Sequence, residues 1–351
     1  MIKFEGFALV LVLWVLSLLT IMAGSFALTM RREAAIVSGS RSNAEAIAIA
    51  ESGLAIAEMM LMIPEPRQHW RSDGSIYQID YQYAKVRVQL FAETGKVDLN
   101  TADEATLKML MTMAPIDIKM QTKLVNAILD WRDADDLIHL DGAEKNEYKK
   151  AGLSYKPRNK PFQSIEELQL VLGMDARIYQ WLENLITVHS KQPKVDLTKA
   201  SKEILQILSG ADAQLLDQYI AARRESAING LPAPAFNAVD SFNAGHLANR
   251  AKAVSEQADD DQSNVSQPLP NAPAAGEISG QEGIISVITE AQLDDGTTAT
   301  LNVMIQPADN PGMPPFQALK WQRNFSSESS LFTEDKDQLL VRQYAEPQFN
   351  D

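Results

Sequence analysis

Residues 7–28 read FALVLVLWVLSLLTIMAGSFAL, a run of 22 residues without one ionisable side chain. As a helix rising 1.5 Å per residue, such a run is about 33 Å long, which is enough to cross the hydrocarbon core of a bilayer. Only six residues precede it, and the sequence that follows stays favourable for helix. The run therefore predicts a protein that its own N-terminus attaches to a membrane.

Three interpretations of this start remain open on the run alone. It can be a generic single-pass anchor. It can be a secretory signal cut after Ser25 and Ala27, although the run is longer than the apolar core of about 7–15 residues that is usual in signal peptides. It can also be a prepilin-type leader that ends at Gly6, with Phe7 as the first mature residue. The rest of the chain has to decide between them.

Composition narrows the functional classes. The 351 residues carry a formal net charge of −14, which disfavours a broad nucleic-acid surface because phosphate binding needs clustered Lys and Arg. The chain has no Cys, so it has no disulfide, thiolate metal site or cysteine nucleophile. Lys3 precedes the apolar run and Arg31 and Arg32 follow it, so the positive-inside rule does not decide the orientation.

The segments beyond the run predict a helix and a sheet. The Ala-rich residues 29–63 have an apolar stripe at steps of three and four, and Pro64 and Pro66 end this helix. Residues 76–93 alternate polar and apolar side chains, and residues 284–306 hold two alternating runs around an Asp-Asp-Gly-Thr turn, which predicts a hairpin. Residues 316–325 are typical of a last strand.

Between the early and the late strands lies a helical insertion that contains an internal repeat. Residues 96–107, KVDLNTADEATL, return at residues 194–205 as KVDLTKASKEIL, and each copy leads into a helix that ends in Arg. We expect N-cap oxygens at Asn100 or Thr101 and at Thr198. The resulting division is a leader at 1–6, a membrane part at 7–28, the rest of the long helix and the first strands at 29–97, the insertion at 98–254, a flexible acidic linker at 255–283, strands at 284–325 and a polar tail at 326–351.

The repeated segment resembles the start of helix-hairpin-helix modules in competence-type DNA-binding proteins. In those modules a Gly-x-Gly turn lets backbone amides approach a DNA phosphate. The turns here read Ala-Pro-Ile-Asp117 and Ser-Gly-Ala-Asp212. Proline offers no N–H group, and each aspartate repels a phosphate. We therefore expect the hairpin fold without the nucleic-acid site, and a membrane-anchored DNA-binding protein stays as the alternative function.

An acidic run surrounds a turn at Gly142. Several oxygen ligands within a short stretch are what Ca²⁺ prefers, although the spacing is not that of an EF-hand. A solvated loop is the competing interpretation. The candidate calcium ligands are Asp133, Asp135, Asp136, Asp141 and Glu144. No catalytic set of residues stands out, so we expect a protein that is not an enzyme and that needs no cofactor apart from a possible calcium ion.

Taken together, these parts resemble the K-subunit minor pseudopilins of bacterial type II secretion. The resemblance rests on the GFALVLVLWVL start, the AESGL motif at 50–54, the GKVDLN motif at 95–100 and the helical insertion. It implies an α+β fold in which a type IV pilin-like long N-terminal helix packs on an antiparallel sheet, with a large all-α insertion of the helix-hairpin-helix or SAM-like type. A minor pilin of a type IV pilus is a further alternative, against which the insertion argues.

The resemblance also implies a function and partners. A prepilin peptidase would cut between Gly6 and Phe7 and methylate Phe7, and the bulk of the chain would lie in the periplasm beyond a single-pass inner-membrane anchor. The protein would cap the tip of a short pseudopilus with the I and J minor pseudopilins, above a shaft of the major pseudopilin, and would carry calcium. Most pilins have Glu at mature position five, where this chain has Leu11. Leu11 is thus the predicted tip-specifying position.

Overall fold

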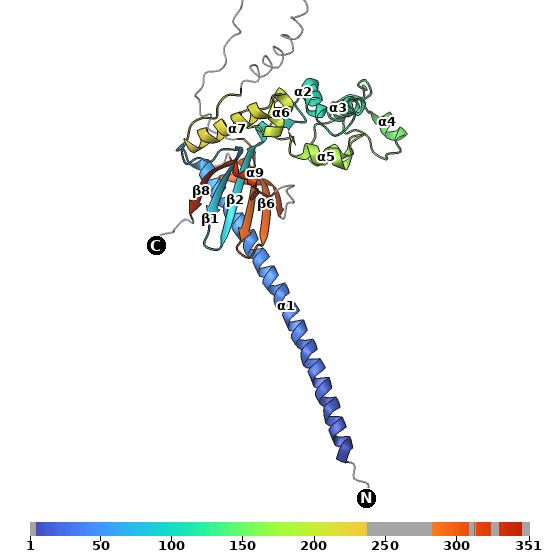
Figure 1. Cartoon of the computed structure of the whole chain (residues 1–351). Helices are drawn as coiled ribbons and strands as arrows, with labels where there is room; N and C mark the ends of the chain where they lie inside the picture. The colour runs from blue at the N-terminus through green and yellow to red at the C-terminus, as the bar shows by residue number, and fades with distance from the viewer. Residues whose placement is uncertain (1–4, 237–282, 309–311, 313, 324–329, 346–351) are drawn as a thin grey trace, which may run out of the picture.

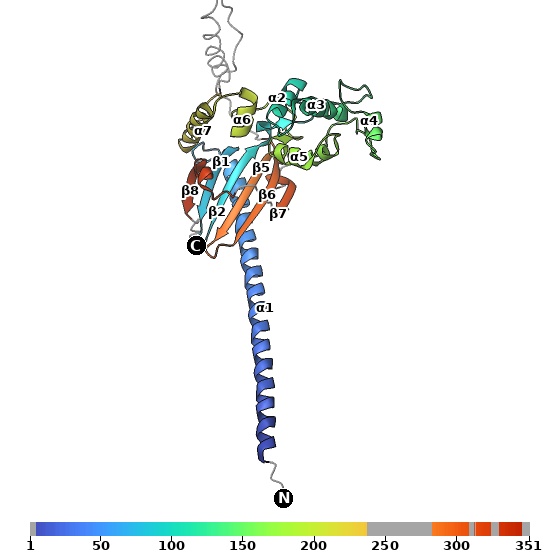
Figure 2. The same ribbon diagram turned by 45° about the vertical axis from the view of Figure 1, so that its right-hand side comes forward.

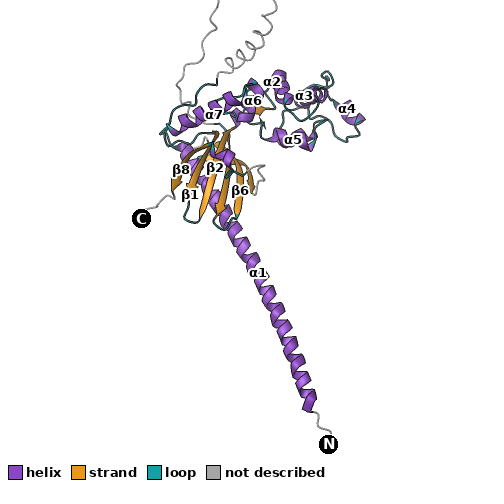
Figure 3. Cartoon of the chain, in the orientation of Figure 1, coloured by secondary structure: helices purple, strands orange, loops and turns teal. Residues whose placement is uncertain are grey.

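The computed structural model describes residues 5–236, 283–308, 312, 314–323 and 330–345. Most of the predicted linker, the end of the insertion and parts of the leader and tail therefore lie outside the described residues. The chain has three parts, a long helix, a sheet beside its second half and a helical layer at the far end of the sheet (Figures 1 and 3).

The long helix, α1 (Glu5–Met62), joins the apolar run to the water-facing helix without a break. Its first half is long and apolar enough to cross a bilayer, and none of that stretch is buried against the rest of the chain. In its second half the side chains that face the sheet recur at steps of three and four residues. They are the buried residues Ala46, Ala50, Leu54, Ala57 and Leu61.

Six strands form one sheet in the order β7-β6-β5-β2-β1-β8. All neighbours are antiparallel except β1 and β8, which run parallel. The strands are β1 (Asp73–Asp80), β2 (Ala84–Ala92), β5 (Ile285–Leu293), β6 (Thr298–Pro307), β7 (Phe316–Arg323) and β8 (Leu340–Ala345). Figure 2 shows the sheet in front of the upper part of α1, with β7 and β8 at its two edges.

The core between α1 and the sheet is apolar and tightly packed. Val86 and Val88 of β2 and Val303 of β6 are fully buried against the helix. A Cβ atom at Gly53 would lie 2.9 Å from Val86 Cγ2, so glycine is what allows helix and sheet to approach this closely. The predicted α+β arrangement of a pilin-like helix on a mainly antiparallel sheet is confirmed.

The first strands predicted within residues 29–97 form a hairpin of β1 and β2 that turns at residues 81–83. One local prediction differs from the structure. The segment predicted as a polar tail contributes β8 at the edge of the sheet, beside β1. The C-terminal segment is held to the sheet ahead of β8, because Leu331 is buried on the outer face of the sheet. The Leu331 carbonyl accepts a hydrogen bond from the buried Arg87, and the Leu331 N–H donates one to the buried Glu290.

The insertion forms a helical layer with its own core, and its two repeats are two helical hairpins. The first hairpin is α2 and α3, and the second is α6 and α7. The elements are η1 (Glu93–Gly95), β3 (Val97–Asp98), α2 (Glu104–Thr112), α3 (Ile118–Arg132), α4 (Lys145–Lys150), η2 (Ile165–Leu170), α5 (Ala176–Glu183), β4 (Ile186–Thr187), α6 (Lys202–Ser209), α7 (Ala213–Ile228) and, in the C-terminal segment, α9 (Glu334–Asp337). Strands β3 and β4 pair in parallel at the base of this layer.

Candidate functional site

The hairpin turns hold their aspartates as helix caps. Asp117 Oδ1 accepts a hydrogen bond from Met120 N at 2.9 Å, and Asp212 Oδ1 accepts one from Leu215 N at 2.8 Å. The first helices are capped by Asp103 and Ser201, not by the residues predicted for that role. The aspartates therefore accept hydrogen bonds from backbone N–H groups at the start of the second helix, where a phosphate would have to bind in a DNA-binding hairpin.

Each predicted N-cap region instead forms a turn closed by the repeated aspartate. Asp98 Oδ1 accepts from Asn100 N at 2.8 Å, and Asp196 Oδ1 accepts from Thr198 N at 3.0 Å. These are the side-chain turns that Asp favours, and they compete with the capping role at the following residues. The prediction placed the caps one turn too early because both patterns need the same residue types.

A buried carboxylate organises the loop that follows the first hairpin. Asp130, in the last turn of α3, is fully buried. Its Oδ2 accepts a hydrogen bond from Ala143 N at 2.7 Å, and its Oδ1 accepts one from His139 N at 3.1 Å and contacts the His139 ring. A Cβ atom at Gly142 would lie 2.1 Å from Asp130 Oδ2, so glycine is needed where the loop passes the carboxylate.

Further acidic side chains gather around Asp130. Ligand atoms of Asp130, Asp133 and His139 lie within 4.8 Å of one another. Glu144 is 5% exposed, and neither of its carboxylate oxygens has a hydrogen-bond partner among the described residues. Asp133 Oδ1 is likewise buried and unpartnered there. These orphaned oxygens are what a bound cation would satisfy.

The charges of this cluster act on one another. Burial, and then the neighbouring carboxylates of Asp130, Asp133 and Asp136, raise the pKa of Glu144 to about 7. Burial and the charges of Asp135 and Asp130 raise the pKa of Asp133. A divalent cation would relieve this repulsion, because an opposite charge favours the ionised carboxylates.

The predicted ligands separate into two groups. Asp133 and Glu144 lie in the cluster, while Asp135, Asp136 and Asp141 are exposed. Asp135 accepts from Leu137 N at 2.8 Å, and Asp136 accepts from Asn159 Nδ2 at 3.0 Å. Asp130 and His139 were absent from the predicted ligand set. Asp130 belongs to the same acidic run, and its position three residues before Asp133, the C-cap of α3, is the signal that could have added it.

The second hairpin fastens the helical layer to the sheet. Arg223 of α7 is 4% exposed, donates to Ala200 O at 2.7 Å and lies 3.9 Å from the buried carboxylate of Asp73. Arg224 donates to Leu340 O of β8 at 2.6 Å, and Arg71 donates to Ser226 Oγ at 2.8 Å. The layer is therefore held to the sheet by arginine side chains that are buried or that donate hydrogen bonds across the contact.

The fold defines a pilin-like protein with a helical insertion, and its N-terminal helix is long and apolar enough to cross a membrane. A family model described as "Type II secretion system (T2SS), protein K" matches residues 88–191. Type II secretion system protein K of Klebsiella pneumoniae is 42% identical over 60 residues, which is 17% of this chain and 18% of that protein. Its counterpart from Dickeya chrysanthemi is 32% identical over 75 residues, 21% of this chain and 20% of that protein.

These matches cover part of the chain. The matched stretches span about a fifth of the length of the curated relatives. The crystal structure of the GspK-GspI-GspJ complex from the type 2 secretion system of enterotoxigenic Escherichia coli aligns over 85% of this chain and 99% of that chain, with 18% identity and a TM-score of 0.45. Over residues 88–191 the chain therefore matches the family of type II secretion system protein K, to which both relatives belong by name.

Proposed function

We propose that this chain is the minor pseudopilin that caps the tip of the type II secretion pseudopilus and helps to start its assembly for protein export. The observation that carries the proposal is the position of the helical layer. It covers the end of the sheet that lies away from the N-terminus of α1 (Figure 1). A subunit stacked above this one would have to occupy the same space, so the arrangement suits the last position of a filament.

Leu11 supports the same position. It lies in α1, and it becomes residue five if the chain is cut between Gly6 and Phe7. An amino group inside an apolar filament core needs a carboxylate partner, and leucine offers none. A subunit with leucine at this place fits only where no other subunit's amine has to be neutralised, which is the tip, the end at which assembly of the filament starts.

The first test is mass spectrometry of the N-terminal peptide, on protein made in a host with a prepilin peptidase. We expect a mature chain that begins at N-methylated Phe7. A chain that begins at Leu28, or that keeps Met1, would contradict the pseudopilin route and leave only an exported or a plainly anchored protein.

The second test locates the protein in the filament. Gold-labelled antibody against the helical layer should mark one end of overproduced pseudopili, and the I and J minor pseudopilins should copurify with the chain. The proposed place of the protein is the bacterial inner membrane, with residues after the span in the periplasm. Label along the whole shaft would overturn the capping role while leaving the family unchanged.

We also propose that the loop after α3 binds calcium through Asp130, Asp133 and Glu144, because an oxygen-rich donor set with orphaned carboxylates fits that ion. Bound calcium would hold the loop to the end of α3. Thermal unfolding of the full chain in detergent should shift upward with millimolar Ca²⁺. Glu144→Gln should weaken the calcium affinity at least tenfold, whereas the distant exposed control Asp294→Asn should leave it unchanged. If calorimetry detects no heat of calcium binding and the unfolding temperature does not shift, the calcium site is refuted.

A further inference from the structure

An unusually basic segment lies in this acidic chain. Residues 145–160 read KNEYKKAGLSYKPRNK, with six basic side chains and one acidic one, while the whole chain has a net charge of −14. The segment consists of α4 and the loop after it. We call it the lysine segment.

The lysines of this segment are exposed and mostly without an ion-pair partner. All five are exposed. Lys150 pairs with Glu147 at 3.1 Å while its side chain stays 77% exposed. Among the residues that the structure describes, the other four form no ion pair. The one arginine, Arg158, is held by Glu167 at 2.6 Å. The free positive charge of the segment is thus carried by lysines alone.

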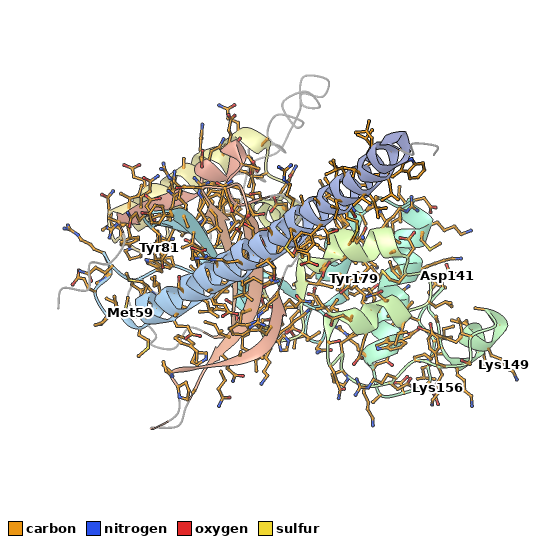
Figure 4. All side chains as sticks on the ribbon, turned by 90° about the horizontal axis from the view of Figure 1, so that it is seen from below. Met59, Tyr81, Asp141, Lys149, Lys156 and Tyr179 are labelled. Carbon is orange, nitrogen blue, oxygen red and sulfur yellow. The ribbon has the colours of Figure 1, made fainter. Side chains whose placement is uncertain are left out.

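The lysine segment lies at the outer end of the helical layer. Figure 1 shows α4 on the side of the layer that points away from the sheet, with the N-terminus of α1 at the opposite end of the molecule. In Figure 4, Lys149 and Lys156 project from this outer rim. Residues 29–62 of α1, which follow the apolar run and whose second half packs on the sheet, are about 50 Å long, so an upright α1 keeps the segment well away from the membrane that it spans.

Exposed apolar side chains lie next to the lysines. Leu137 is 76% exposed and Leu140 is 83% exposed, on the loop between α3 and α4 that also carries the exposed Asp135, Asp136 and Asp141. Asn159 of the lysine segment joins this loop through its hydrogen bond to Asp136 at 3.0 Å. Tyr155, in the segment itself, is 39% exposed. Lysines beside protruding leucines are a combination typical of surfaces that bind lipid headgroups.

We propose that the lysine segment docks on an anionic bilayer surface other than the membrane that α1 spans, with Leu137 and Leu140 entering the headgroup region. A protein partner is less suited, because protein interfaces favour Arg and exclude Lys, and the arginine of this segment is already engaged. Four to eight cationic side chains on one face are enough to hold a protein at an anionic lipid surface. The proposal stands on the segment itself and is independent of the capping role.

The test uses the full chain held in nanodiscs of neutral phosphatidylcholine. Flotation then measures its binding to separate vesicles of phosphatidylcholine, with or without phosphatidylglycerol, at one fixed calcium concentration. We expect binding only to the vesicles that contain phosphatidylglycerol, and loss of binding as the salt concentration rises. Nanodiscs without protein are the blank.

Variants distinguish binding through the lysine segment from a general effect of the net charge of the protein. Lys149→Glu/Lys156→Glu/Lys160→Glu should weaken binding about a hundredfold or more. The control Lys85→Glu/Lys119→Glu/Lys194→Glu changes three exposed lysines elsewhere by the same charge and should weaken it far less. Leu137→Ser/Leu140→Ser should weaken binding without any change in charge, which a purely electrostatic contact would not show.

Three outcomes would overturn the proposal. Equal losses in the two lysine triples would show that only net charge matters. Equal binding to neutral vesicles would remove the role of the lysines. Tighter binding of the full chain to duplex DNA or to polyglutamate than to the anionic vesicles would assign the segment to a nucleic acid or to an acidic protein instead.

Discussion

The two helical hairpins of the insertion share a repeated sequence and a fold but differ in their surroundings. In the first, α3 ends at the buried Asp130 and leads into an exposed acidic loop. In the second, α7 carries Arg223 and Arg224, which bind backbone oxygens and reach the sheet. The first hairpin therefore presents a loop at the outer end of the layer, while the second hairpin fastens the layer to the pilin-like domain.

The difference teaches that the repeat encodes the hairpin and not its role. In both copies an arginine of the second helix donates to the carbonyl of a matching alanine, Ala102 in the first and Ala200 in the second. The copies differ in the buried carboxylate beside each hairpin. In the first, Asp130 of α3 contacts His139 of the following loop. In the second, Arg223 of α7 lies near Asp73 of the sheet.

The largest effect is expected from Arg223→Ala in the fastening hairpin. The variant leaves buried carbonyls without a donor and removes one of two cations beside the buried Asp73, so unfolding should become easier by about 3–5 kcal/mol. Denaturant titration of the full chain in detergent measures this change. Arg224→Ala, at a less buried position, serves as the control and should cost about 1 kcal/mol. Similar costs for both variants would argue against Asp73 as the anchor of the layer.

A matched pair of glycines gives the next effect. Gly142→Ala places a methyl group against Asp130 and should cost about 1–3 kcal/mol and lower the calcium response. Gly210 of the second hairpin has a φ of 63°, but an added Cβ atom would have no neighbour within 4 Å, so Gly210→Ala should cost only about 1 kcal/mol, from backbone strain alone. The calcium-induced thermal shift should survive in Gly210→Ala. Its loss there would mean that the shift does not report on the acidic loop.

The smallest effect is expected at the two equivalent caps. Asp117→Ala and Asp212→Ala should each cost about 1 kcal/mol, because each removes one N-cap hydrogen bond. Thermal unfolding of the two variants checks whether the hairpins are locally equivalent. Neither variant should gain affinity for duplex DNA in a fluorescence polarisation assay. A gain in Asp117→Ala would revive the DNA-binding alternative.

Much of the fold could be predicted from patterns along the chain. The length of the apolar run and the prolines after it set the extent of α1, and the Asp-Gly turn set the hairpin of β5 and β6, where Gly296 has a φ of 85°. The candidate site was predicted only in part. Glu144 was among the expected ligands, but Asp130 and His139 were not, because their role depends on a loop that folds back onto α3.

The sequence by itself determined the long apolar helix, the strand pattern, the repeated hairpins and the resemblance to a family, because each depends on residues that are close along the chain. Only the tertiary structure decided which aspartates are buried, where the lysine segment lies and that the C-terminal segment adds β8 beside β1. The physical reason is that burial and charge pairing arise between residues far apart in sequence. Arg87 and Leu331, for example, are 244 positions apart and meet on one face of the sheet.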